Sequence, residues 1–304
     1  MILFVVNEGS GNGRGAAVWQ QVEAQLKVRG VDYTAVLAKS AEEAYERTDM
    51  LLRTTSMNVV AVVGGDGSLH GILPLLAGTG IPIGIIPAGS GNDTSLAFSI
   101  PRDPVAALDV VLSGRTRAAD VIQTTAAGQS QLTVTAIAIG LDAAVAGDVN
   151  GSRYKRWCNK LRLGSLAYLI GFARGVSRFK TSNITVMLDG ARHRFERGWI
   201  STITNTASYG GGLRICPDAR FDDGSLHLCV VHGCGLMRLL YVFPTLFTGK
   251  HVNNRNVTML RGRHAIIETS HPFLAYGDGE PSGETPIEAK LLPGQLVFLT
   301  IASG

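Results

Sequence analysis

The glycine-rich stretch Gly64-Gly65-Asp66-Gly67-Ser68 restricts the fold of this chain more than any other feature. The apolar, β-branched run at 58–63 before it predicts a strand buried on both faces. A helix is expected after it, with Leu69, Ile72 and Leu76 on one face, and Pro74 should shorten or kink that helix. Glycines at such a turn permit positive φ and let a bulky ligand approach the main chain.

The chemistry of this turn indicates an anion. The N-terminus of the following helix offers unpaired N–H groups, for which phosphate is a natural ligand. Asp66 would repel bound phosphates unless a divalent cation lay between them. The turn therefore indicates phosphate and a metal ion. The alternative is an ordinary glycine turn in which Asp66 is a hydrogen-bonding turn residue.

Two similar turns, 8–15 and 87–93, also follow apolar strands. The predicted strands are 2–6, 33–37, 58–63 and 81–86, and the predicted helices around them include 41–52 and 105–112. This alternation predicts a parallel sheet with right-handed crossovers. Ligands of such sheets bind beyond the C-terminal ends of the strands. All three turns should therefore gather at one edge, with Asp66 and Asp93 facing the same ligand.

The first turn also fits a dinucleotide-binding spacing, because Gly11, Gly13 and Ala16 match G-x-G-x-x-A. That interpretation needs an acid at the end of the second strand to hold a ribose hydroxyl, and Lys39 and Ser40 stand there instead. No P-loop motif occurs in the sequence. The loop can still bind phosphate through its N–H groups and Arg14, or it can be a purely structural turn.

Composition limits the remaining classes of protein. The 304 residues suffice for two domains, and a net charge of +4 is too small to indicate nucleic acid. The four cysteines lack a zinc-binding spacing, so reduced thiols in a cytoplasmic protein are expected. The longest apolar run, 239–247, is about half the length of a membrane-spanning helix. We expect a soluble protein that can still act at a membrane surface.

From about residue 120 the pattern changes to strands separated by turns such as Asp189-Gly190. The predicted strands are 131–139, 184–188, 199–204, 226–231 and 265–268. They indicate a mostly antiparallel sandwich or barrel, interrupted by a helical stretch around 160–178. Basic residues lie before and within that stretch: Arg153, Lys155, Arg156, Lys160 and Arg162, with Tyr154 and Trp157 among them. This cluster could contact an anionic lipid surface, or it could be an ordinary solvated face.

Two acidic segments stand out in this second part. Three aspartates lie within 218–223, and a hard cation would relieve their repulsion, although a polar surface turn is the alternative. Further on, Asp278 and Glu280 are spaced i, i+2, which on an extended segment places both carboxylates on one side. Paired acids near a phosphate site could share metal handling and proton abstraction. An ordinary hairpin turn is the alternative.

With these motifs in this order, the chain resembles the diacylglycerol kinase catalytic-domain family, specifically its soluble bacterial lipid kinases. The segments that carry the resemblance are 7–14, 64–68, 87–93, 210–212 with 217–219, 222–224, 249–251 and 278–280. They span nearly the whole chain, although the GGDG motif alone is shared with NAD kinases and phosphofructokinases. The resemblance implies a phosphofructokinase- and NAD-kinase-like α/β nucleotide domain at 1–122. A β-sandwich domain would follow at 123–304, with a last strand that could return to the first domain.

The resemblance also implies ATP bound in the cleft between the domains and phosphoryl transfer to a lipid hydroxyl. Glu280, beside Asp278, matches the family's proton acceptor, and Asp66 would act through Mg²⁺. A structural Mg²⁺ is implied on the Asp223 carboxylate and on main-chain oxygens near Arg220 and Ser225. The residues assigned to the nucleotide are Asn7, Gly11, Arg14, Ser40, Gly64, Gly65, Asp66, Gly67, Ser68, Leu69, His70, Gly71, Ser90, Asn92 and Asp93.

The chain departs from the family in three places. Ser68 stands where relatives usually carry Thr, which keeps the hydroxyl, and His70-Gly71 replaces the usual Asn-Glu. Ser40 or Lys39 is the nearest equivalent of the family's second-strand Thr.

Three functions remain open: a lipid kinase, an NAD kinase that shares GGDG and ATP, and a nucleotide-binding regulatory protein without turnover. The expected partners are ATP, Mg²⁺, a lipid substrate and a peripheral membrane surface, with no nucleic acid and with a homodimer left open.

Overall fold

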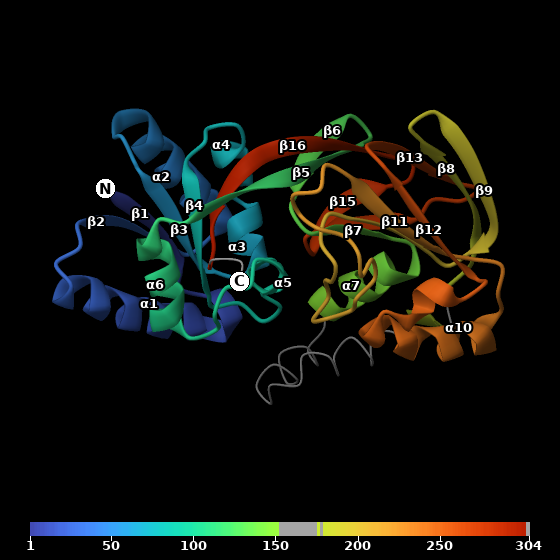
Figure 1. The fold of residues 1–304 in the computed structure, drawn as a ribbon, viewed down its shortest axis with the longest axis horizontal. Helices are drawn as coiled ribbons and strands as arrows, with labels where there is room; N and C mark the ends of the chain where they lie inside the picture. Colours follow the sequence, from blue (N-terminus) through green and yellow to red (C-terminus); the bar gives the residue numbers. More distant parts are fainter. Residues whose placement is uncertain (152–174, 177–178, 302–304) are drawn as a thin grey trace. The chain divides into compact units, whose positions relative to one another are not determined.

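A computed structural model describes residues 1–151, 175–176 and 179–301 of the chain (Figure 1). It divides into two compact units: unit 1 consists of Met1–Ala119 with Gly294–Gly304, and unit 2 of Asp120–Pro293. Two strands, β5 (Thr116–Ala126) and β16 (Ile287–Leu299), each begin in one unit and end in the other. The basic cluster at 153–162 and most of the helix predicted at 160–178 lie outside the described residues.

Unit 1 has the predicted alternation of strands and helices. Its elements are β1 (Ile2–Asn7), α1 (Ser10–Val28), β2 (Tyr33–Ala38), α2 (Ala41–Thr54), β3 (Val59–Gly64), α3 (Asp66–His70), α4 (Leu73–Leu76), β4 (Pro82–Pro87), α5 (Asp93–Ala97) and α6 (Pro104–Ser113). The strands lie in the order β2-β1-β3-β4, all parallel, and Val297 and Phe298 of β16 pair with β4, also in parallel.

The sheet of unit 1 is covered on both faces, because adjacent residues of its central strands are all buried. Phe4, Val60 and Ile83 have no exposed surface, and each stabilises the fold by about 1.5–3 kcal/mol. The helix expected after β3 is divided into α3 and α4. Pro74 lies in the first turn of α4, where its missing N–H costs nothing, so the predicted interruption at this proline is confirmed.

Unit 2 is mostly β. Its elements are the end of β5, β6 (Gln129–Thr133), β7 (Ala136–Ile139), α7 (Leu141–Gly151), β8 (Ser182–Leu188), β9 (Ala191–Gly198), β10 (Ile200–Thr204), β11 (Leu226–Val231), α10 (Leu236–Val242), η1 (Phe243–Thr248), η2 (Lys250–Asn253), β12 (Val257–Gly262), β13 (His264–Thr269), β14 (Leu274–Gly277), β15 (Glu280–Glu284) and the start of β16.

Two antiparallel sheets form this sandwich-like unit. One has the order β12-β11-β10-β7-β14-β15, and in the other β16, β13, β8 and β9 are neighbours. Alternate residues of β11 face two different cores: Leu228 packs among residues of both sheets, whereas Cys229 packs toward α7 and α10. The expected fold, an α/β domain followed by a β-sandwich-like domain, is confirmed.

The segment predicted as one strand at 131–139 forms two strands that pair with different neighbours. It breaks at Val134-Thr135 into β6, which pairs with β5, and β7, which pairs with β10 and β14. The break has a physical reason: the N–H groups of Val134 and Thr135 donate to the Asp278 carboxylate. The prediction of one continuous strand was therefore wrong. In the described part of the chain, no helix is long and apolar enough to cross a membrane.

Candidate functional site

The second and third glycine turns of unit 1 pack directly against each other. A Cβ added to Gly89 would lie 2.5 Å from the Cα of Gly65, so neither position tolerates a side chain without movement. Asn92 closes the third turn, because its amide oxygen accepts from the Gly89 N–H at 2.9 Å and its amide nitrogen donates to the Gly89 carbonyl at 2.9 Å. These contacts bring the two turns together where β3 and β4 end.

Asp66 ties these two turns together. Its carboxylate accepts hydrogen bonds from the N–H groups of Asp93, at 3.0 Å, and Thr94, at 2.9 Å. A Cβ placed on Gly91 would lie 3.2 Å from Asp66 Oδ2 and 3.7 Å from Asp93 Oδ2. The structure therefore brings the two carboxylates together around Gly91, and Asp66 has a structural task in addition to any role with a ligand.

The first turn packs on the other two. Gly11, Asn12 and Gly13 have φ values of 60°, 62° and 90°, so the regular part of α1 begins only after them. Positive φ at Gly11 brings it against the third turn, where an added Cβ would lie 2.3 Å from the Ala88 carbonyl oxygen. Arg14 also reaches the third turn, and its Nη2 donates to the Gly89 carbonyl at 2.8 Å.

A side-chain contact joins the first and second turns. Asn7 Nδ2, at the end of β1, donates to Ser68 Oγ at 3.0 Å. A Cβ on Gly64 would meet the same serine at 2.5 Å, so the second turn has no room there. Leu69 is buried in the core, at 3% exposure, so only its main chain could reach a nucleotide. Ser90 and Gly67 lie in these turns, as their sequence positions require.

Ser40 has a local role that the sequence already indicated. Its side chain caps α2 by accepting from the Glu43 N–H at 3.1 Å, while the Glu43 carboxylate accepts from the Lys39 N–H at 2.9 Å. The sequence pattern is the S-x-x-E of a capping box, although the Glu43 carboxylate binds the N–H one residue before the cap. A Cβ on Gly71 would lie 3.6 Å from that of Ala41, so the His70-Gly71 departure lies beside the start of α2.

Asp278 occupies a tight turn between β14 and β15 in unit 2. Its φ is 50° and that of Gly279 is 86°. The carboxylate accepts from the N–H groups of Val134 and Thr135, both at 2.8 Å, and from the Thr135 hydroxyl at 2.6 Å. Asp278 and Glu280 are therefore not alternate residues of one extended segment, and that spacing argument was wrong.

Glu280 differs sharply from Asp278 two residues before it. It is exposed and opens β15, opposite Gly277. Asp278 is held by donors from the β6–β7 connection, whereas the Glu280 carboxylate can meet a substrate. The hairpin alternative thus describes the backbone correctly, and the backbone presents Glu280 to solvent.

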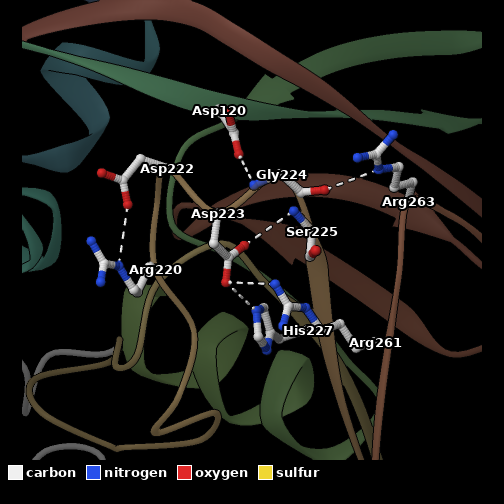
Figure 2. A network of polar contacts seen from close by, with 9 residues as sticks. All are labelled: Asp120, Arg220, Asp222, Asp223, Gly224, Ser225, His227, Arg261 and Arg263. Carbon is white, nitrogen blue, oxygen red and sulfur yellow. Dashed lines mark hydrogen bonds and ion pairs between the residues drawn. The ribbon is translucent and has the colours of Figure 1, made fainter.

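The acidic loop of unit 2 is held together by donors from the protein (Figure 2). Asp223 accepts from the Ser225 N–H at 3.1 Å, and its Oδ2 lies 2.8 Å from His227 Nε2 and 3.4 Å from Arg261 Nη2. The Asp223 N–H donates to the Arg220 carbonyl at 3.3 Å. The same loop is fixed by Asp120, whose Oδ2 accepts from the Gly224 N–H at 2.8 Å.

The two expected cation positions therefore differ in their fit to Mg²⁺. Asp66 and Asp93 offer two neighbouring carboxylates at the glycine turns, which suits a Mg²⁺ held by carboxylates together with phosphates. At Asp223, a guanidinium lies against the oxygen that a cation would use, so that arrangement does not fit a cation. Mg²⁺ at Asp223 stays a prediction that the geometry does not favour. Among the described residues, no cluster of three or more metal-binding side chains occurs.

A small apolar pocket in unit 2, with a cavity volume of about 10 Å³, was not predicted from the sequence. Its lining is Leu141, Asp142, Val145, Ile200, Tyr209, Leu213, Ile215, Phe243 and Leu246. The Tyr209 hydroxyl donates to Asp142 Oδ2. Burial raises the pKa of Asp142 to about 7. The sequence signal for this site was Asp142, an acid shortly after the buried strand β7, because a buried acid needs a polar partner.

Comparison with known proteins gives consistent results. Residues 1–124 match the family model "Diacylglycerol kinase catalytic domain", and residues 135–300 match "YegS C-terminal NAD kinase beta sandwich-like domain". The chain is 33% identical to a Mycobacterium tuberculosis protein named diacylglycerol kinase, over 98% of this chain and 94% of that protein. A Staphylococcus carnosus protein of the same name is 24% identical, with 93% and 89% covered.

Solved structures share the fold. A crystal structure of a diacylglycerol kinase from Bacillus anthracis superimposes with a TM-score of 0.72 at 18% identity, covering 98% of this chain and 96% of that one. An NAD kinase from Archaeoglobus fulgidus in complex with ATP has a TM-score of 0.50 at 14% identity, with 99% and 94% covered. At these identities the two structures support the fold alone.

Proposed function

This chain belongs to the diacylglycerol kinase catalytic-domain family, and on that premise we propose that it is an ATP-dependent lipid kinase. It would transfer the γ-phosphate of ATP to the hydroxyl of diacylglycerol or a related lipid alcohol. The observation that carries the proposal is the packing of three glycine-rich turns around Asp66 and Asp93 in unit 1. We also propose that the protein is cytoplasmic and associates peripherally with membranes.

The role of unit 1 is to hold the triphosphate. Gly11, Gly65 and Gly89 let the three turns pack main chain against main chain. A Cβ added at Gly13 would meet no atom within 4 Å, so a phosphate oxygen can approach the main chain there. Arg14 donates to one carbonyl and has further N–H groups for an anion. Mg²⁺, held by Asp66 and Asp93 together with the phosphates, would neutralise charge on the transferred group.

Glu280 is the proposed proton acceptor. In the reaction a bond forms between the acceptor oxygen and the γ-phosphorus, and the bond to the β–γ bridging oxygen breaks, so ADP leaves. The hydroxyl proton passes to the Glu280 carboxylate as the new bond forms. A positioned base contributes typically about 10²–10⁴-fold to such a step. Asp278 fixes the turn that presents Glu280 and is a positioning residue, because three donors already bind its carboxylate.

The test supplies γ-labelled ATP with a total lipid extract, with purified diacylglycerol, or with NAD. We expect labelled phospholipid, loss of the product in Glu280→Gln, and full activity in Glu284→Gln, which removes an exposed acid from the same strand. Labelled NADP without labelled lipid would replace the proposal by an NAD kinase. Absence of any labelled product, with ATP bound, would leave a nucleotide-binding protein without turnover.

A further inference from the structure

Helix α10 is apolar on both of its sides. Leu239 and Val242 face the core of unit 2 with 1% exposure each. The opposite side is also apolar, with the exposed residues Leu236, Met237, Leu240 and Tyr241, and Phe247 of η1 is exposed as well. The outer side of a surface helix is normally polar, so a group of five exposed apolar side chains marks an interaction surface.

The charged side chains of the segment 224–267, in which these residues lie, are all basic. The sequence has no Asp or Glu between Asp223 and Glu268, whereas Arg238, Lys250 and Arg255 lie in that interval and are exposed. The Arg238 guanidinium lies over the Tyr241 ring, 5.1 Å from its centroid. Aromatic and aliphatic side chains flanked by cations suit the headgroup region of an anionic bilayer. A protein partner would need an acidic and apolar face of matching shape, and no feature of the described residues indicates such a partner.

The same segment forms a wall of the apolar pocket. Phe243 and Leu246 of η1 line it on one side, and Leu141 and Val145 of α7 line it on another. Its polar pair, Asp142 with Tyr209, is hydrogen-bonded internally, so the inner side of the segment packs on an apolar surface. The exposed apolar surface and the pocket are thus the outer and inner sides of one short segment, 236–248.

We propose that this segment docks unit 2 on an anionic lipid bilayer, with Met237, Tyr241 and Phe247 inserted into the interface. The docking deepens the peripheral membrane association proposed above, and it does not depend on the proposed kinase activity. The basic cluster at 153–162 lies outside the described residues and is not used in this proposal.

Vesicle flotation without ATP tests the docking directly. The variant Met237→Ser/Tyr241→Ser removes two side chains that are 79% and 66% exposed, so folding should be nearly unaffected. The control Val28→Ser/Met50→Ser removes side chains of unit 1 that are 82% and 58% exposed. On vesicles of phosphatidylglycerol and phosphatidylcholine we expect the partition coefficient of the first variant to fall at least ~tenfold, which is about 1.4 kcal/mol. The control should bind as the wild type does.

Removing positive charge gives a second, independent test of the docking. Arg238→Gln/Lys250→Gln should weaken binding to anionic vesicles and leave the weaker binding to pure phosphatidylcholine unchanged, because it removes only the electrostatic attraction. Wild-type flotation of the Met237→Ser/Tyr241→Ser variant would overturn the proposal. So would a change of that variant's mass in light scattering without any change in flotation, which would identify the surface as a contact between two copies of the chain.

Turnover separates this inference from the proposed function. The Met237→Ser/Tyr241→Ser variant should lose phosphorylation of diacylglycerol in vesicles but keep it on a short-chain, monomeric diacylglycerol. Equal loss on both acceptors would overturn the docking role. If the wild type phosphorylates neither acceptor while the variant still loses flotation, the docking surface is supported and only the proposed function fails.

Discussion

The sharpest prediction compares two acids of one hairpin, Asp278 and Glu280. Asp278→Asn keeps a residue that tolerates the positive φ of this turn, so the backbone itself is not strained. It replaces one carboxylate oxygen by an NH₂ group, which then faces a main-chain donor. Val134 and Thr135 are 1% and 2% exposed, so the N–H group left without an acceptor cannot turn to water.

The magnitude follows from this geometry. A buried donor without a partner costs about 1–3 kcal/mol, and the remaining bonds lose the strength that a charged acceptor gives them. We expect Asp278→Asn to lower the free energy of unfolding by about 2–5 kcal/mol, or Tm by roughly 4–20 °C for a unit of this size. Glu280→Gln changes an exposed side chain, so its unfolding free energy should stay within about 0.5 kcal/mol of wild type.

Urea unfolding followed by circular dichroism measures both variants, with ATP binding and lipid turnover measured alongside. Asp278→Asn should unfold at a lower urea concentration, whereas Glu280→Gln should unfold normally, bind ATP and lose turnover. A wild-type midpoint for Asp278→Asn would refute the claim that its carboxylate anchors the turn. Full turnover in Glu280→Gln would remove its role as the base.

Three further predictions follow from the other acids. Asp66→Ala should lose most turnover, and its free energy of unfolding should fall by about 1–3 kcal/mol because the N–H groups of Asp93 and Thr94 lose their acceptor. A kinase assay and calorimetry measure the two effects, and a normal Tm would exclude the structural role of Asp66. Asp142 keeps its proton up to about pH 7 when folded, against a usual pKa of 3.8, so stability should fall as pH rises from about 4 to 7, by at most about 4 kcal/mol. Asp142→Asn should flatten that slope in urea titrations at several pH values, and an unchanged slope would assign it to other groups. Asp223→Ala should lower Tm, since it leaves the Ser225 N–H and the buried His227 ring without their acceptor. Mg²⁺ without nucleotide should shift the Tm of both proteins equally, and a rise confined to wild type would place the ion at Asp223 after all.

The parts of the fold that the sequence revealed are those governed by local rules. Strands β1, β3 and β4 are runs of apolar residues that end in glycine turns, and each was predicted within a residue or two of its bounds. Their parallel pairing follows from the intervening helices, and it places Asp66 and Asp93 at one edge. Local rules were sufficient here because the glycine turns are continuations of the strands.

Contacts between distant segments could not be predicted in the same way. The break at Val134-Thr135 depends on Asp278, far along the chain, and hydropathy alone favours a continuous strand there. The Asp142–Tyr209 pair similarly joins α7 to a loop between β10 and β11, so neither residue stands out by spacing. In both cases an acid acquires its role from main-chain or hydroxyl donors that only the tertiary structure brings to it.

Strand β16 has a consequence for the order in which the chain can fold on the ribosome. Its residues Val297 and Phe298 complete the sheet of unit 1 beside β4, and the Phe298 ring lies 4.2 Å from that of Phe98. Until these residues emerge, β4 keeps an unpaired edge while the whole of unit 2 is being synthesised. An unpaired strand edge can form hydrogen bonds with other chains. A nascent chain stalled before residue 294 should therefore aggregate or recruit chaperones, and a peptide carrying the β16 sequence supplied in trans should suppress this.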